Sequence, residues 1–221
     1  MALIENPGRE RILGRIREAL KRPAKIHAVP KPESVSRPIF APIPDALERF
    51  QGECARNSTE LIVTGDSRAT SAALAGVLTS LPAGEIFVQD APELRQISPV
   101  LLVRKDIRWS SEGGPPENSQ ATITLAEVLV AQTGSVMVSE ACGGRGASIV
   151  APVHVVVAKA SQLVPTLEEG FARVRERKVA ANNSYLCLIT GSSRTADIEK
   201  ILVMGAHGPR RLVAILELTP A

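Results

Sequence analysis

The sequence predicts an α/β fold in which a mostly parallel sheet forms the middle of a three-layer α/β/α arrangement. Short apolar runs alternate with helical patterns along most of the 221 residues, which is typical of such a fold. Hydrophobic residues make up 44% of the chain and aromatic residues only 3%, so the core must consist of Val, Ile, Leu and Ala, the usual filling of a covered parallel sheet. The length favours one large domain with an appendage. We expect residues 1–44 to form a basic helix and an extended arm, and residues 45–221 to form the α/β domain.

The first predicted element is an amphipathic helix that begins with Asn6 as N-cap and Pro7 at its first position. The segment is basic, because residues 1–31 hold eight Arg and Lys and three Glu, a net charge of +5. The overall net charge is +3, so the rest of the chain carries −2. The apolar stripe needs cover, from the body of the protein or from a second copy in a homo-oligomer; a membrane surface is a further alternative. No aromatic side chains interleave the cations, so we expect no nucleic-acid partner. The stripe consists of Ile12, Leu13, Ile16, Ala19 and Leu20.

Six prolines between Pro23 and Pro44 favour an extended arm after this helix. Apolar runs beyond the arm predict strands at Leu61–Val63, Phe87–Val88, Val100–Val103, Ile123, Val136–Val138, Val153–Val157, Leu186–Ile189 and Leu212–Leu216.

Helical patterns lie between several of these strands. They cover Arg68–Thr79 after an Asp66-Ser67 cap, a short helix from Pro92, Leu125–Gln132, and Thr166–Lys178 with Leu167, Phe171 and Val174 facing inward. The runs between Gly134 and Val157 leave little room for a helix, which indicates an antiparallel excursion.

Several classes of protein are disfavoured by the sequence. No apolar run approaches the roughly 20 residues of a membrane span, and the N-terminus lacks the core of an export signal, so we expect a cytoplasmic protein. Three separated cysteines and three separated histidines provide no metal-ligand motif, and no dinucleotide fingerprint follows a strand. We therefore expect no metal and no cofactor. Cys142 is the one candidate reactive thiol, with a buried structural cysteine as the alternative.

Ligands of open α/β sheets bind beyond the carboxyl ends of the strands, so the loops after the apolar runs are the candidate site. The run Tyr185–Ile189 is followed by Gly191 and by capping residues that predict a helix starting near Thr195. Free N–H groups at that helix start, beside Arg194, predict a site for a carboxylate or phosphate. An ordinary strand-to-helix turn is the alternative. The predicted ligand-binding residues here are Gly191, Ser192, Ser193, Arg194 and Thr195.

Two further loops carry candidate residues. Glu140 and Arg145 flank a glycine pair that follows the Val136–Val138 strand, so Glu140 is a candidate base and Arg145 a candidate anion ligand; a mobile, solvated connection is the alternative. His207 is a candidate proton-transfer group in a Gly-Pro turn, with Arg210 beside it to pair with a carboxylate; a hydrogen-bonded strut is the alternative for His207.

These segments also carry a family resemblance. Gly191, Thr195–Glu199 and Gly205–Pro209 resemble the lactate utilization protein C family, also called the LUD domain, and two earlier segments, Ala131–Val136 and Ala151–Val157, agree in order. The chain departs from the family where Ser192 replaces the usual Pro, which puts the shape of that loop in question. The resemblance implies a fold like that of sugar-phosphate isomerases and CoA transferases.

Two functions follow as expectations, and whether the chain is itself an enzyme stays open between them. The resemblance implies a cluster-free component of a multiprotein system that oxidises L-lactate to pyruvate, acting with iron–sulfur and redox partners. The alternative is a stand-alone isomerase or transferase for a sugar phosphate or an acyl-CoA ester, with Glu140 as base or nucleophile.

Overall fold

The computed structural model describes residues 7–22, 41–97, 99–114, 116–195, 203–205 and 208–218. The chain divides into two compact units, Met1–Ala41 and Pro42–Ala221. In the first unit, helix α1 (Pro7–Leu20) confirms the predicted N-terminal helix, and its Ile12, Ile16 and Leu20 are exposed. Asn6 and most of the predicted arm lie outside the described residues. None of the described helices has the length and apolar character that spanning a membrane requires.

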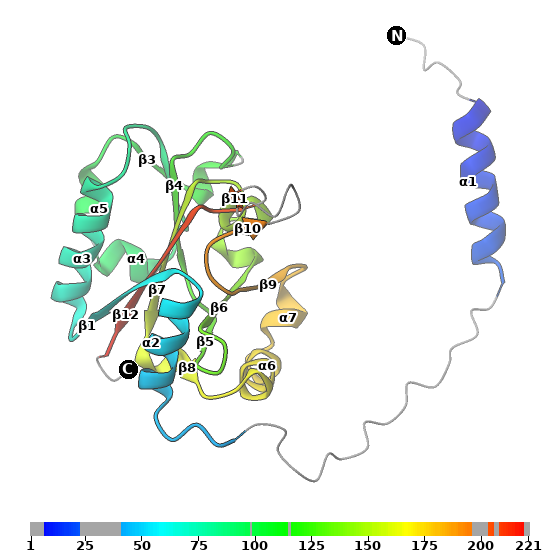
Figure 1. The fold of residues 1–221 in the computed structure, drawn as a ribbon. Helices are drawn as coiled ribbons and strands as arrows, with labels where there is room; N and C mark the ends of the chain where they lie inside the picture. The colour runs from blue at the N-terminus through cyan, green and yellow to red at the C-terminus, as the bar shows by residue number, and fades with distance from the viewer. Residues whose placement is uncertain are drawn as a thin grey trace. The chain divides into compact units, whose positions relative to one another are not determined.

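The second unit is built on a six-stranded sheet in which every neighbouring pair of strands is parallel (Figure 1). This confirms the predicted α/β class. Strand β7 has alternate residues buried against opposite faces of the sheet, and this explains its continuous apolar sequence. The strand order is β1 (Thr59–Thr64), β12 (Arg211–Glu217), β7 (Val153–Lys159), β4 (Ala121–Leu125), β2 (Ile86–Val88) and β3 (Ile107–Trp109).

Helices α3 (Ser67–Thr79), α4 (Pro92–Ile97) and α5 (Pro99–Val103) cover one face of this sheet. Leu74, Leu94 and Leu101 from these helices are buried against Ile123 and Ile215 of the strands. The predicted cap of α3 is confirmed, because Asp66 Oδ1 accepts a hydrogen bond of 2.8 Å from the Ala69 N–H.

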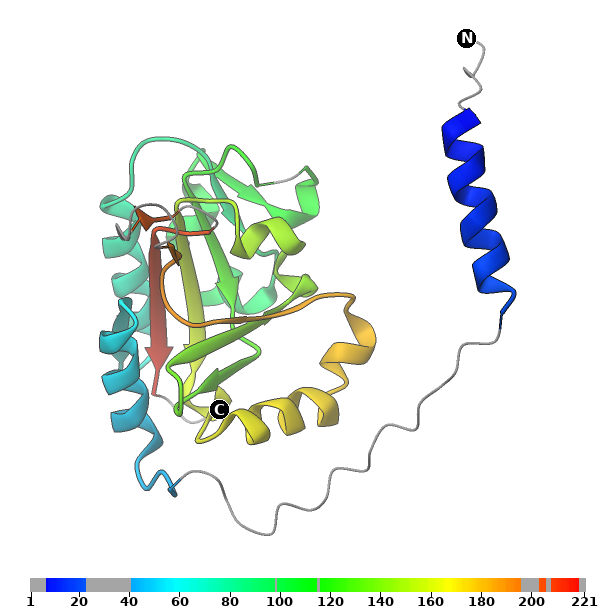
Figure 2. The ribbon, with the colours of Figure 1, turned by 45° about the vertical axis from the view of Figure 1, so that its right-hand side comes forward.

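The other face is covered by α2 (Ala46–Arg56) and by a second sheet, which α6 (Leu167–Glu176) and α7 (Val179–Asn182) cover from outside (Figure 2). Two of its three strand pairings are antiparallel, as predicted for this part of the chain. Its order is β8 (Leu163–Val164), β5 (Val128–Val130), β6 (Ser135–Ser139) and β9 (Leu186–Ile189).

The remaining elements are short. They are the 3-10 turns η1 (Ser110–Glu112), η2 (Glu140–Cys142), η3 (Arg145–Ser148) and η4 (Ala160–Gln162), and the paired strands β10 (Arg194–Thr195) and β11 (Val203–Met204).

Two predicted elements have the wrong type. The run Val100–Val103 was predicted as a strand, but it belongs to helix α5, which Pro99 starts; an apolar run this short does not distinguish a strand from a buried helix. The stretch Leu125–Gln132 was predicted as a helix, but its centre is strand β5, which pairs with β6.

One detail of the predicted helices is wrong, and another lies mostly outside the described residues. Phe171 is 45% exposed rather than inward-facing, because Gly170 takes the inward position on α6; a Cβ on Gly170 would lie 3.1 Å from Val130 Cγ2. Arg194 and Thr195 pair with β11 as strand β10, so the helix predicted to start near Thr195 does not include these two residues. Residues 196–202 lie outside the described residues.

Candidate functional site

The Gly191 loop lies at the amino ends of the parallel strands. The Ser192 hydroxyl donates to Ser58 O (3.1 Å), just before β1, and accepts from the N–H of Leu212 at the start of β12 (3.3 Å). The Ser193 N–H donates to Pro209 O (2.8 Å). These groups of the predicted anion site are therefore already hydrogen-bonded within the fold.

Gly191 has a structural role in this loop. Its φ of +82° favours glycine, and a Cβ there would lie 2.1 Å from Asn57 O, closer than any real contact. The loop therefore packs backbone against backbone, which leaves no room for a ligand at Gly191 itself. Arg194 is exposed at the far end of the loop.

Of the other predicted residues, Arg145 and Arg210 are exposed. The Arg145 guanidinium lies over the Tyr185 ring, 5.5 Å from its centroid. The Arg210 N–H donates to Pro152 O (2.8 Å) just before β7. His207 lies outside the described residues.

Glu140 connects η2 to the segment before β9. Its Oε2 accepts hydrogen bonds from the Ser184 hydroxyl (2.6 Å) and the Ser184 N–H (2.9 Å). The hydroxyl bond is the main reason that the pKa of Glu140 lies below its usual value, and the charge of Arg145 contributes to lowering it. A lowered pKa makes a carboxylate a weaker base, so this geometry suits an anchor between two segments better than the predicted base.

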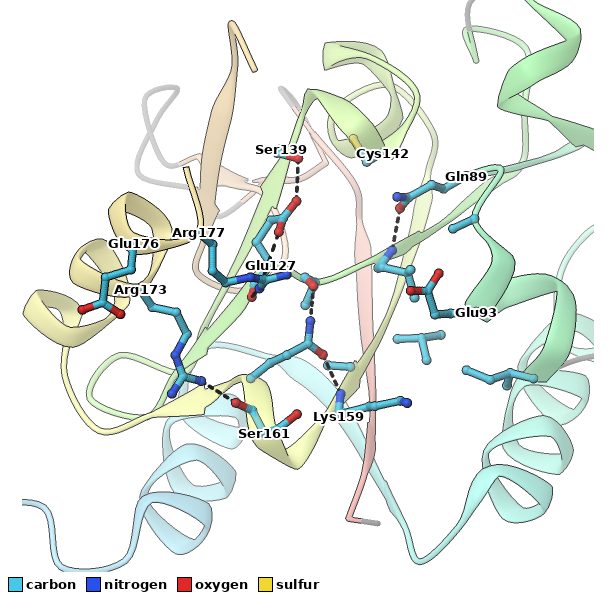
Figure 3. Close-up of a pocket in the computed structure, with 17 residues that line it drawn as sticks. Gln89, Glu93, Glu127, Ser139, Cys142, Lys159, Ser161, Arg173, Glu176 and Arg177 are labelled. Carbon is cyan, nitrogen blue, oxygen red and sulfur yellow. Dashed lines mark hydrogen bonds and ion pairs between the residues drawn. The ribbon is translucent and has the colours of Figure 1, made fainter. Parts of the chain in front are cut away.

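A cavity of about 630 Å³ lies at the opposite, carboxyl edge of the main sheet (Figure 3). Gln89 follows β2, Leu125 ends β4 and Lys159 ends β7, so the carboxyl ends of three parallel strands line the cavity. Helix α6 supplies the opposite wall through Arg173, Glu176 and Arg177, the last of which caps that helix. This is the edge at which open α/β sheets bind ligands, and the volume falls in the range of small-molecule pockets.

Two glutamine side chains hold the floor of the cavity. Gln89 Oε1 accepts from the Leu125 N–H (2.8 Å). Gln162 Oε1 accepts from the Lys159 N–H (2.7 Å), while its Nε2 donates to Ala126 O. These bonds fix the loops after β2, β4 and β7 to one another.

Three cations line the cavity, and each keeps unused hydrogen-bond donors. Arg177 Nη1 donates to Glu127 O (3.1 Å) and lies 3.8 Å from Glu127 Oε2. Arg173 donates to Ser161 O. Lys159 Nζ has no partner among the residues that the structure describes. Guanidinium and ammonium groups in this state can bind a carboxylate or a phosphate.

Burial keeps two thiols and one imidazole of the described residues uncharged. Burial raises the pKa of both the Cys142 and the Cys54 thiol to about 12, so Cys142 is a structural cysteine although it borders the cavity. Burial lowers the pKa of His154 to about 4, so this imidazole is neutral, and its Nε2 bonds to Thr124 Oγ1 (2.9 Å). Within the described ranges, no three His, Cys, Asp or Glu side chains are grouped as metal ligands.

The cavity lies where the strand-end rule places a ligand, but none of the predicted catalytic or ligand-binding residues that the structure describes lines it. Arg173 and Arg177 are four residues apart in the predicted Thr166–Lys178 helix, so they share a face, and Lys159 lies just beyond the carboxyl end of the predicted strand Val153–Val157. These two signals could have identified the cationic wall. Two of the three predicted loops follow β6 and β9, which belong to the second sheet, and the third, with His207 and Arg210, precedes β12 at the amino edge of the main sheet.

Comparison with known proteins agrees with this architecture. Residues 116–216 match the LUD domain family. Proteins called lactate utilization protein C match nearly the whole chain: that of Bacillus subtilis (strain 168) is 27% identical over 94% of this chain and 95% of its own length, and that of Geobacillus kaustophilus is 26% identical over the same shares. This chain is therefore similar to LUD-domain proteins and to lactate utilization protein C.

A solved structure shares the fold. The crystal structure of a DUF162 family protein from Deinococcus radiodurans superposes with a TM-score of 0.60 and 21% identity, covering 77% of this chain and 95% of that one. The range that matches the LUD domain family spans strands β4 to β12 almost completely, and thus includes most of the cavity wall.

Proposed function

We propose that this protein takes part in lactate utilization and that it binds the carboxylate of lactate in the cavity at the carboxyl edge of its main sheet. The full-length similarity to lactate utilization protein C supports the process. The observation that carries the binding site is the cationic wall formed by Arg173, Arg177 and Lys159.

The chemistry of this wall suits a small organic acid. Arginine pairs with a carboxylate through two parallel hydrogen bonds, and Nε and Nη2 of Arg177 have no other partner in the described part of the chain. A three-carbon acid fills only part of a cavity of about 630 Å³, so charge rather than shape selects it. Affinity for lactate alone is correspondingly modest.

The finer proposal is that the chain is a cluster-free component of a system that oxidises L-lactate to pyruvate, with the redox chemistry on iron–sulfur partner proteins. The raised pKa of Cys54 and Cys142 supports this division of labour, since protonated, buried thiols do not exchange electrons readily. Affinity capture of the full chain from cells grown on lactate, followed by iron analysis of the proteins recovered, tests it. Recovery of the chain alone argues against it.

The binding site is tested by calorimetry with L-lactate on the wild type, Arg177→Ala and Arg175→Ala. Arg175 is the matched control, because it is an exposed arginine on the same helix that does not line the cavity. We expect Arg177→Ala to weaken binding about tenfold, the usual effect of one hydrogen bond to a charged group, and Arg175→Ala to leave it unchanged. Equal effects would contradict the site.

The same calorimetry separates the two functions. Glucose 6-phosphate is included as a second ligand, and binding of this sugar phosphate without binding of lactate favours the isomerase or transferase alternative. Growth on lactate of a strain that lacks the gene, restored by the wild type but not by Arg177→Ala, supports the lactate role in the cell.

A further inference from the structure

Glu127 and Arg177 lie side by side on the cavity wall, Glu127 as a hydrogen-bond acceptor and Arg177 as a donor (Figure 3). Glu127 lies in the turn between β4 and β5, and its side chain is 19% exposed. Its Oε1 accepts from the Ser139 hydroxyl (2.7 Å), and its Oε2 lies 3.8 Å from Arg177 Nη1. The carboxylate is therefore held in one orientation beside the guanidinium.

Both members of this pair keep unused hydrogen-bonding capacity. An ionised carboxylate has about four acceptor positions, and the described partners of Glu127 occupy two of them. Arg177 has five N–H groups, of which only those on Nη1 have a described partner. The wall thus presents donors for an anion and, next to them, an acceptor for a hydroxyl.

A 2-hydroxy acid has the complementary arrangement, because its carboxylate accepts and its hydroxyl on the adjacent carbon donates. We propose that Glu127 is a specificity-determining residue that accepts a hydrogen bond from the hydroxyl of a 2-hydroxy acid while Arg177 binds the carboxylate. This inference rests on the proposed function and adds to it the selection of the reduced acid over the 2-oxo acid.

The selection follows from the hydrogen-bonding capacity of the two ligands. The ketone oxygen of a 2-oxo acid can only accept hydrogen bonds, and so can the Glu127 carboxylate. The two oxygens therefore form no hydrogen bond and repel each other electrostatically. A propionate methylene offers nothing to Glu127 and leaves its acceptor positions unfilled. A site that hydrogen-bonds a ligand hydroxyl discriminates against analogues that lack one.

The test is calorimetric binding of L-lactate, pyruvate and propionate to the full chain at constant ionic strength. We expect the wild type to bind lactate about tenfold more tightly than either analogue. In Glu127→Gln the amide can donate to a ketone oxygen, so the lactate-to-pyruvate preference falls to about one or inverts. Glu176→Gln is the matched control: it removes the same charge from the same cavity, and the preference stays as in the wild type.

The outcomes distinguish this inference from the proposed function. Equal binding of lactate and propionate by the wild type overturns the role of Glu127 but leaves the carboxylate site intact. Failure of all three acids to bind contradicts the proposed function itself. Thermal unfolding checks that Glu127→Gln is folded, and the wild-type panel decides the question even if that variant is not.

Discussion

The two edges of the main sheet use polar groups in opposite ways. At the amino edge, the Gly191 loop hydrogen-bonds to Ser58 and Pro209, just before β1 and β12, and to Leu212 in β12, through the Ser192 hydroxyl and the Ser193 N–H. At the carboxyl edge, Lys159 and Arg177 retain donors that the described residues do not use. The contrast teaches that a glycine-containing turn can serve only to connect strands, whereas a ligand site requires side chains whose hydrogen-bond donors are not used within the fold.

The largest expected effect is at the amino edge. Gly191→Ala places a Cβ against Asn57 O and forces alanine to adopt a φ of +82°, so we expect a loss of about 3 kcal/mol or more in the free energy of unfolding. Urea denaturation measures it. Gly76→Ala is the control, because a Cβ there meets nothing within 4 Å and the site is helical. If both variants are equally stable, the close approach at Gly191 is not real.

The next effect is a dependence of stability on pH through His154, near the amino end of β7. Its pKa is about 4 in the folded state and near 6.5 when unfolded, so the unfolded state binds the proton more readily. The contribution of neutral His154 to the free energy of unfolding is fully present above pH 6.5. The free energy of unfolding falls by about 3 kcal/mol as the pH is lowered to 4. Urea midpoints of the wild type and His154→Gln, measured between pH 7 and 4, check it. The midpoint should depend less steeply on pH in the variant than in the wild type, because the variant lacks this imidazole.

A smaller effect compares the edges directly by ligand binding. Arg194 remains the predicted anion ligand at the amino edge, and Arg177 is the proposed one at the carboxyl edge. We expect Arg177→Ala to weaken lactate binding about tenfold and Arg194→Ala to change it by less than about twofold. The reverse order would move the binding site to the Gly191 loop.

The smallest effect concerns thiol chemistry. Cys142 borders the cavity, but burial raises its pKa to about 12, so alkylation at pH 8 should leave it unmodified in the folded protein. Cys187 is half-buried and should react first. Mass spectrometry after a short iodoacetamide pulse identifies the modified residue, and early labelling of Cys142 would show that the cavity wall opens.

Much of the fold was predictable because local patterns agree with tertiary packing. Asp66 precedes a helical pattern and caps α3, and the β7 run is continuous because both faces of that strand are buried. Val128–Val130 was misread because its neighbours resemble a helix, and only pairing with β6 makes it a strand. Pairing with a distant segment is not visible in a local pattern.

The site was less predictable for a topological reason. The rule that ligands bind at strand carboxyl ends was applied to every loop, but β6 and β9 belong to a second sheet with mixed directions. The cavity instead combines Gln89, Lys159 and Arg177, which are far apart in sequence and come together only once the strand order is known. The arginine spacing on α6 and the position of Lys159 after the β7 run were the local signals of this cavity.

The glutamine side chains of the cavity floor have a consequence for its behaviour in acid. Gln89 and Gln162 join neighbouring loops through amide groups, which neither gain nor lose a proton across the biological range. The frame that positions Lys159 is therefore insensitive to acidification, even where protonation of His154 weakens the protein as a whole. Molecules that are still folded in mildly acidic solution therefore keep the loops after β2, β4 and β7 joined to one another.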